Sequence, residues 1–308
     1  MSSSGRTRRR PADARTPLDR FEVTFWGVRG SVPAPGAKTR RYGGNTPCVE
    51  VRAGGNRLIL DAGSGLRALG ERLRDSGGPV EADFLLSHYH YDHLQGLPFF
   101  APLAEPGNRF VFHGPRREGR SVQDVLEGQM VPPYFPVTLD QLARAAIEFR
   151  SVEPGERFEI GVVRVTSAEL DHPGGNLGYR LEFRGRTLVY ATDVEHTDRP
   201  AESLVELARG ADVLLHDAMY VDSEYEQRRG WGHSTWAGAL ATAEAAEVKT
   251  LVLFHHDPER DDRALDAVLK RVQKQFPRTI AAREGVTIRI AGKARLTEPA
   301  AARYSRRR

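Results

Sequence analysis

The stretch HYHYDH at residues 88–93 places four potential metal ligands within six positions of the chain. It closely follows an apolar run, Phe84–Leu86, that predicts the end of a buried strand. A turn mounted on a strand end is held at a fixed position, so ligands placed there form a rigid site. The first two histidines can face one ion, and Asp92 and His93, just after the bend, can serve a second. Imidazole and carboxylate groups suit zinc, manganese or iron(II).

The segments on either side of this turn predict alternating β-rich and helical blocks. The run Phe21–Trp26 alternates as a strand does, and Gly54-Gly55-Asn56 between two apolar runs predicts a hairpin. Two β-rich blocks, each followed by helices, predict an α/β fold of two packed sheets with helices outside. Because no linker divides the chain, we expect one domain over residues 21–298, with disordered basic tails at 1–20 and 299–308.

The two ends of the chain dominate its charge. Residues 1–20 carry six Arg and two Asp, and residues 299–308 carry four Arg and no acid, so each end contributes +4. Because the whole chain carries +4, residues 21–298 carry −4. The tails suit weak, non-specific contact with nucleic acid or anionic lipid, or they only keep the protein soluble.

The single cysteine and the absence of long apolar runs bear on location. Cys48 lies in an apolar run, so we expect a small buried residue rather than a nucleophile, and no intrachain disulfide can form. These features favour a reducing, cytoplasmic compartment. No apolar stretch reaches the ~18–20 residues of a membrane span, and the N-terminus lacks the apolar core of a secretory signal.

Three further predicted strand ends carry residues that can bind metal. His172 follows one strand, Asp193 another and His255 a third, with His256 as a poorer candidate because His255 comes directly after its strand. The carboxyl ends of strands are where α/β proteins place their chemistry. Each residue alone is equally consistent with an ordinary loop polar group. Together with residues 88–93, they supply enough ligands for two metal sites.

With these motifs in this order, the chain resembles the metallo-β-lactamase-fold hydrolases from roughly Phe21 to Ile290. The resemblance implies a four-layer αββα sandwich, with Asp61 as the strand-end aspartate that braces the histidine loop. It also implies two divalent ions, zinc foremost and manganese or iron as alternatives. One ion would be held by His88, His90, His172 and Asp193. The other would be held by Asp92, His93, Asp193 and His255. Dimers are common in this superfamily, so a homodimer is an alternative to a monomer.

A second pair of motifs is similar to the tRNase Z and phosphodiesterase branch of that superfamily. The run LHDAMY at residues 215–220 precedes GHST at 232–235, which opens a predicted helix. By this likeness, Asp217 would orient His233, and His233 would contact the scissile phosphate as a general acid. A cationic histidine at a helix N-terminus favours a phosphoryl oxygen. The alternative is that Ser234 is a plain helix N-cap and His233 a loop residue.

The Gly/Pro-rich entry stretch adds further candidate residues to the predicted site. Residues 26–31 (WGVRGS) and 42–46 (YGGNT) are similar to small phosphodiesterase-like members, including the cyclic-phosphate phosphodiesterase of phosphonate metabolism. Glycines there let the backbone approach the metal centre closely. Arg29, Ser31 and Asn45 would either contact phosphate or substrate or only tie the two loops together.

The expected function is therefore that of a dinuclear metal-dependent phosphodiesterase acting on a cyclic nucleotide, a small cyclic phosphate or RNA. A hydroxide bridging the metals would be the nucleophile. Asp92, Asp217 and His233 would be the catalytic residues. The alternatives are a tRNA 3′-processing endonuclease, for which residues 113–120 are a weak candidate for a basic arm, and a carbonyl-ester hydrolase such as a lactonase or β-lactamase. A non-enzymatic binding protein acting through its arginine tails is a third possibility.

Overall fold

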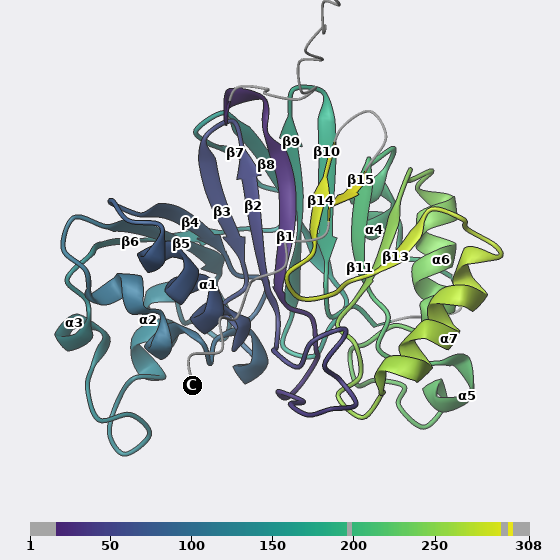
Figure 1. The fold of residues 1–308 in the computed structure, drawn as a ribbon, viewed down its shortest axis with the longest axis horizontal. Helices are drawn as coiled ribbons and strands as arrows, with labels where there is room; N and C mark the ends of the chain where they lie inside the picture. Colours follow the sequence, from purple (N-terminus) through teal and green to yellow (C-terminus); the bar gives the residue numbers. More distant parts are fainter. Residues whose placement is uncertain (1–16, 196–198, 291–294, 298–308) are drawn as a thin grey trace, which may run out of the picture.

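The computed structural model describes residues 17–195, 199–290 and 295–297, and most of both predicted tails lies outside these ranges. Two mixed β-sheets form its centre (Figure 1). The first sheet has the strand order β15-β14-β1-β2-β3-β4-β5-β6, and the second has the order β13-β12-β11-β10-β9-β8-β7.

The bounds of the strands follow. The first sheet consists of β1 (Phe21–Gly27), β2 (Cys48–Ala53), β3 (Asn56–Leu60), β4 (Glu81–Leu85), β5 (Arg109–Pro115), β6 (Ala146–Val152), β14 (Thr287–Arg289) and β15 (Arg295–Thr297). The second sheet consists of β7 (Arg157–Ile160), β8 (Val163–Leu170), β9 (Asn176–Phe183), β10 (Arg186–Ala191), β11 (Val213–Asp217), β12 (Leu251–Phe254) and β13 (Thr279–Ala281).

Helices cover the outer face of each sheet. On the first sheet lie α1 (Gly65–Asp75), α2 (Val122–Gly128), α3 (Leu139–Leu142) and the 3₁₀ turns η3 (Leu97–Phe99) and η4 (Ala101–Ala104). On the other side of the molecule lie α4 (Glu202–Ala208), α5 (Asp222–Tyr225), α6 (Trp236–Ala245) and α7 (Asp262–Gln273). Two more 3₁₀ turns are η1 (Pro17–Asp19) and η2 (Tyr91–His93). This arrangement confirms the predicted αββα sandwich.

Apolar periodicity explains the layers. In β1 every second residue is buried, and Val23 and Phe25 belong to the core between the sheets. The parallel strands β11 and β12 are buried along their whole length, as expected where helices cover one face and a second sheet covers the other. Leu66, Leu69 and Leu73 recur at helical spacing on α1 and pack on the outer face of the first sheet.

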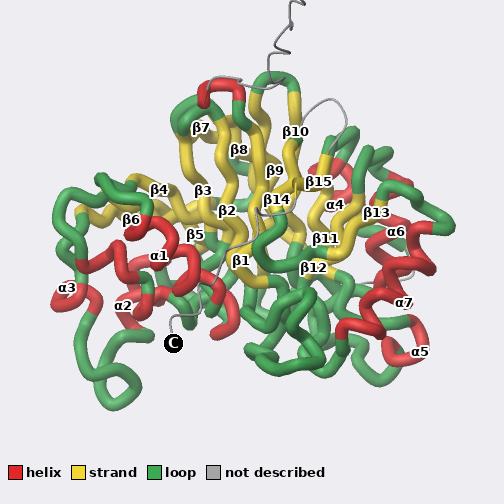
Figure 2. Tube along the Cα trace, viewed as in Figure 1, coloured by secondary structure: helices red, strands yellow, loops and turns green. Residues whose placement is uncertain are grey.

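Parallel pairing brings several strand ends to one end of the sandwich. Strands β3 to β6 run parallel in the first sheet, and β10 to β13 run parallel in the second. Figure 2 shows loops gathered below both sheets, at the lower edge of the view. Residues that are far apart in sequence, and that follow these strands, therefore meet there.

Most predicted elements are present, and the differences are local. The strand expected at residues 84–86 begins earlier, at Glu81, because Ala82 also contributes to the core. Short elements, such as β13 with three residues and α5 with four, were not predicted, because so few residues carry no periodic pattern. No helix among the described residues is long and apolar enough to cross a membrane.

Candidate metal centre

The site is built on strand ends whose backbone turns sharply. Asp61 follows β3, Asp193 follows β10 and His255 follows β12, and all three have a positive φ, of 59°, 49° and 57° respectively. This left-handed region is uncommon for residues other than glycine. Because such a conformation costs free energy, it persists only where the surrounding structure imposes it, and it is concentrated at functional sites.

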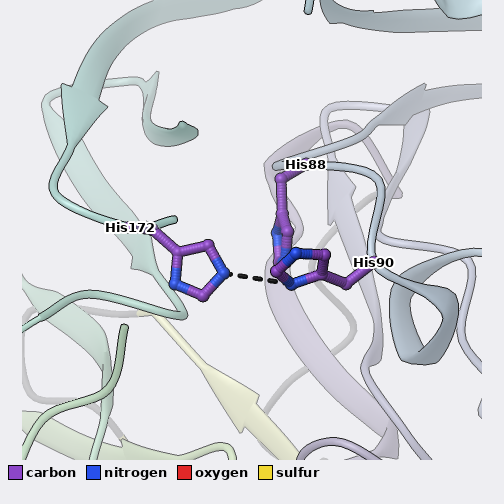
Figure 3. Close-up of side chains that lie close together, drawn as sticks. All are labelled: His88, His90 and His172. Carbon is purple, nitrogen blue, oxygen red and sulfur yellow. Dashed lines mark hydrogen bonds between the residues drawn. The ribbon is translucent and has the colours of Figure 1, made fainter. Parts of the chain in front are cut away.

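His88, His90 and His172 form the first group, which we call the histidine cluster. One ring nitrogen from each residue lies within 4.8 Å of the others. Figure 3 shows the three rings converging from two segments, with His90 Nδ1 3.1 Å from His172 Nε2. His88 Nε2 is buried and has no hydrogen-bond partner among the described residues. A buried imidazole nitrogen without a protein partner fits the role of a metal ligand.

The chain fixes the orientation of two of these rings. His172 Nδ1 donates to the backbone carbonyl of Gly232 at 2.8 Å, so its Nε2 is the nitrogen left for a metal ion. The Nδ1 of His88 lies 3.0 Å from the Ser87 hydroxyl. Burial lowers the pKa of all three histidines. They are therefore held as neutral imidazoles, the form that binds metal.

Asp92, His93, Asp193 and His255 form the second group, the carboxylate cluster, whose ligand atoms also lie within 4.8 Å of one another. Asp92 Oδ2 lies 3.2 Å from His93 Nε2 and 3.3 Å from His255 Nε2. Asp193 Oδ2 lies 3.3 Å from each of the same two nitrogens. All four side chains are buried.

Electrostatics in the carboxylate cluster favour bound positive charge. Burial opposes a proton on His93, but the carboxylates of Asp92 and Asp193 raise its pKa well above the usual range. Burial alone would raise the pKa of Asp92, yet His93 and His255 lower it. Without a metal, the cluster can be balanced only by protons shared between imidazole and carboxylate, and a divalent cation would replace them.

Asp61 braces the histidine loop, the role that the family resemblance implied. Its Oδ2 accepts hydrogen bonds from His93 Nδ1 at 2.7 Å, from the Ser87 hydroxyl at 2.8 Å and from the Tyr190 hydroxyl at 2.7 Å. The bond to His93 leaves Nε2 of that ring facing the carboxylate cluster. The Tyr190 contact was not predicted, because nothing in the sequence relates a strand of the second sheet to residue 61.

Asp217 and His233 form a pair beside the two clusters. Asp217 ends β11, and its Oδ2 accepts a hydrogen bond from His233 Nδ1 at 2.8 Å. Burial lowers the pKa of His233, but the charge and the hydrogen bond of Asp217 outweigh burial and raise it to about 9. Both residues also form a potential ligand group with Asp193 and His255.

The local setting of His233 differs from the predicted one. The helix begins at Trp236, and its N-cap is Thr235, whose side chain accepts from the Gly238 amide. Ser234 is therefore not the cap; its hydroxyl donates to the Val194 carbonyl. His233 precedes the helix by three positions, so the pairing with Asp217, rather than the helix terminus, accounts for its raised pKa.

The entry loop contacts the centre through its backbone. The Ser31 amide donates to Asp92 Oδ2 at 2.8 Å. A Cβ on Gly30 would lie 2.4 Å from His255 Cε1, so only glycine lets the loop pass this close to the ring. This agrees with the prediction that glycines permit close approach.

Arg29 and Asn45 tie segments together, which favours the second of the two roles predicted for them. The Arg29 side chain is fully buried, and its Nε and Nη1 donate to the backbone carbonyls of Gly43, Asp257 and Arg260. Asn45 donates twice to the Glu284 carboxylate. Arg29 is buried away from the surface, with Nη2 only 4.0 Å from an Asp262 oxygen, and Asn45 bonds to Glu284, so we do not count either residue as a substrate contact.

Neither His256, the poorer of the two ligand candidates after β12, nor Cys48 belongs to either cluster. His256 is buried with Nε2 2.9 Å from the Ala282 carbonyl, and burial lowers its pKa to about 3. Cys48 is a buried free thiol whose pKa is raised by burial.

Comparisons with known proteins agree with this geometry. Residues 56–256 match the Beta-lactamase superfamily domain family, Lactamase_B_2. Ribonuclease Z of Methanopyrus kandleri is 28% identical over 311 residues, covering 87% of this chain and 97% of its own. Ribonuclease Z of Archaeoglobus fulgidus is 24% identical over 323 residues, covering 88% and 98%.

Solved structures share the fold at low sequence identity. The metallo-beta-lactamase fold protein YhfI from Bacillus subtilis has a TM-score of 0.66 at 19% identity, over 88% of this chain and 99% of that one. A diphosphatase from the PhnP family has a TM-score of 0.64 at 21% identity, over 87% and 97%. Because the family match spans more than half of the chain, this protein belongs to the beta-lactamase superfamily, as a metal-dependent hydrolase with the metallo-β-lactamase fold.

Proposed function

We propose that the chain is a phosphodiesterase with two divalent metal ions, zinc foremost. The pairing of His233 with Asp217 carries this proposal, because it keeps a cationic imidazole beside the metal centre. A carbonyl-ester hydrolase has no need of such a group, whereas a phosphodiester has both an anionic phosphoryl group and a leaving oxygen that must accept charge or a proton.

The donor set supports two ions rather than one. The side chains of Asp61, Asp92, Asp193 and Asp217 are all buried around the centre. Burying four ionised carboxylates without compensating charge is unfavourable, and two divalent cations would balance them. His88, His90 and His172 would hold one ion, and Asp92, His93 and His255 the other, with Asp193 placed to reach both.

Bound metal ions would supply acidified water and neutralise negative charge on the phosphoryl oxygens. Residues of the chain would orient the general acid and hold the metal ligands in place. Asp217 holds the His233 ring through Nδ1, which leaves Nε2 to donate its proton to the leaving oxygen. Asp61 and the Ser31 amide fix His93 and Asp92, so the ligands do not have to reorganise when substrate binds.

RNA cleavage is a second candidate function, favoured by relatives that are named Ribonuclease Z. The predicted basic arm at residues 113–120 is a short hairpin at the end of β5 rather than a long extension. Cyclic nucleotides and small cyclic phosphates therefore remain substrates to test beside RNA. A cytoplasmic location, a homodimer and weak nucleic-acid contact through the tails are proposals that still rest on sequence.

The deciding experiment is His233→Ala assayed on bis(p-nitrophenyl) phosphate. We expect metal content per chain to stay unchanged and turnover to fall at least about 10²-fold, because the general acid is lost. His113→Gln is a matched control, since His113 pairs with Asp83 outside both clusters and glutamine keeps a donor there. A His233→Ala enzyme with wild-type turnover would rule out the proposed role.

A further inference from the structure

A cavity of about 390 Å³ opens beside the histidine cluster and is not used by the function proposed above. His88 and His90 line it together with Arg117 and Arg120. The two arginines come from the hairpin that follows β5, the strand next to β4 in the first sheet. The hairpin therefore extends the row of strand ends that carries Asp61 and the histidine loop.

The hairpin has a defined geometry. The Arg117 amide donates to the Arg120 carbonyl at 3.0 Å, and the Arg120 amide donates back at 2.8 Å. The two residues between them, Glu118 and Gly119, have positive φ values of 49° and 77°, as in the tight two-residue turns of β-hairpins. Residues that flank such a turn are direct cross-strand neighbours, so their side chains leave on the same face.

Arg117 is held in place from two sides. Its Nη2 donates to both carboxylate oxygens of Glu169, each at 2.9 Å. A Cβ on Gly175 would lie 2.7 Å from Arg117 Cζ, so the guanidinium packs against bare backbone three residues after His172. Arg117 Nε is buried and has no hydrogen-bond partner within the described part of the chain.

Arg120 adds positive charge to the hairpin. It forms no ion pair with any residue in the ranges the structure describes, whereas Arg117 shares its charge with Glu169. Glu118, at the exposed tip, is the acidic residue among those that line the cavity. An anion in the cavity would meet the guanidinium groups of Arg117 and Arg120, which line it together with His88 and His90.

We propose that this cavity is a subsite for a second phosphate group of the substrate, adjacent to the phosphodiester that is cleaved. The inference rests on the proposed phosphodiesterase function and narrows its substrate class to a nucleotide or polynucleotide with a further phosphate. Guanidinium groups suit phosphate oxygens because their planar fork matches two oxygens at once. The arginines select the substrate and take no part in bond cleavage.

Binding to the metal-loaded protein tests the subsite without requiring turnover. Isothermal titration calorimetry would compare thymidine 5′-monophosphate with thymidine 3′,5′-bisphosphate and thymidine 5′-diphosphate, in which the second phosphate lies one sugar away or directly attached. We expect at least one of the two doubly phosphorylated ligands to bind about tenfold more tightly than the monophosphate, because it adds hydrogen bonds to charged groups. The ligand that shows the gain identifies the spacing.

Substitutions test whether the arginines of the hairpin cause this gain in binding affinity. The double variant Arg117→Gln/Arg120→Gln should bind all three ligands equally, with unchanged affinity for the monophosphate. Arg116→Gln is the matched control, because Arg116 lies in the same hairpin, donates to the Gly119 carbonyl and does not line the cavity. It should keep the tenfold gain.

Equal binding of all three ligands by the wild type, no binding of any of them, or a gain that survives in the double variant would overturn the subsite. These outcomes are distinct from failure of the proposed function, which would appear as no hydrolysis of bis(p-nitrophenyl) phosphate, a substrate with no second phosphate. A wild type that hydrolyses this ester but binds all three nucleotides equally would leave the phosphodiesterase standing and exclude the subsite.

Discussion

The histidine cluster and the carboxylate cluster lie side by side but differ in charge. The histidine cluster offers three imidazoles whose pKa values are lowered, and of the three His90 is the one that reaches the surface. The carboxylate cluster offers two carboxylates and two imidazoles, all buried. Asp193 connects the two, because its Oδ1 lies 3.9 Å from His88 Nε2 while its Oδ2 faces the carboxylate cluster.

Because of this difference in charge, we expect the ions in the two clusters to have different roles. A divalent ion in the carboxylate cluster offsets buried negative charge and so contributes to the stability of the fold. An ion in the histidine cluster is bound by three neutral imidazoles and offsets only the charge of Asp193, which both ions share, so it keeps a larger positive charge toward a substrate. We therefore expect the carboxylate cluster to bind its ion more tightly and the histidine cluster to face the substrate.

The largest effect should come from Asp193→Ala, which removes the residue that both clusters share. We expect metal content to fall at both positions and turnover on bis(p-nitrophenyl) phosphate to drop by more than about 10³-fold. Metal analysis of the folded variant by mass spectrometry measures this directly. Retention of one full equivalent would show that the clusters are independent and that Asp193 belongs to only one of them.

A smaller loss is expected from His172→Ala, which affects the histidine cluster alone. One metal equivalent per chain should be lost while the carboxylate cluster keeps its ion, and turnover should fall by roughly 10²-fold. Stepwise removal of metal by a chelator gives an independent measure, since the wild type should lose its first ion without unfolding. Loss of both ions from this variant would contradict the assigned order of affinities.

The same contrast explains what the sequence could predict. The histidine loop was recognisable because four ligands lie within six residues, whereas the role of Asp61, which follows β3, came from the family resemblance. His172, Asp193 and His255 each stand alone, so only the family resemblance related them to one site. The convergence of Asp193 and His255 depends on the parallel order of β10, β11 and β12, and His172 joins them from the end of β8; no local pattern encodes this arrangement.

Other features of the site were beyond sequence reasoning for physical reasons. Arg29 has the chemistry of a phosphate ligand, yet tertiary packing buries it among backbone carbonyls. The hydrogen bond from Tyr190 to Asp61 joins the two sheets across the core. The positive φ at Asp193 and His255 had no sequence signal, because neither residue is a glycine.

Tyr190→Phe should produce a smaller effect, limited to the support of the carboxylate cluster. Losing the hydroxyl leaves Asp61 with one hydrogen bond fewer, and His93 is then held less firmly. We expect metal affinity to fall by about tenfold and the free energy of unfolding to drop by about 1 kcal/mol. Competition with a chromogenic chelator and urea denaturation measure the two quantities. An unchanged metal affinity together with a lower unfolding free energy would restrict Tyr190 to a packing role.

The smallest effect is expected from a change at Asp217, which lies between the carboxylate cluster and His233. Asp217 stabilises the protonated imidazole and so raises the pKa of His233, to about 9 before any charge of bound metal is counted. Activity that needs this proton should be lost as pH rises through the pKa that His233 has in the metal-loaded enzyme, which the cations set below that value. In Asp217→Asn the negative charge is gone, so the pKa falls and the alkaline limb of the kcat/KM profile should move to lower pH by at least about one unit.

Bound cations lower the pKa of His233 in the wild type and in Asp217→Asn alike, so they shift both pH profiles without changing the direction of the difference. Metal content should stay the same in the two enzymes, because His93 and His255 keep their other partners. An alkaline limb that does not move would mean that a group other than His233 titrates there. Asp217 would then not set the pKa that limits activity at high pH.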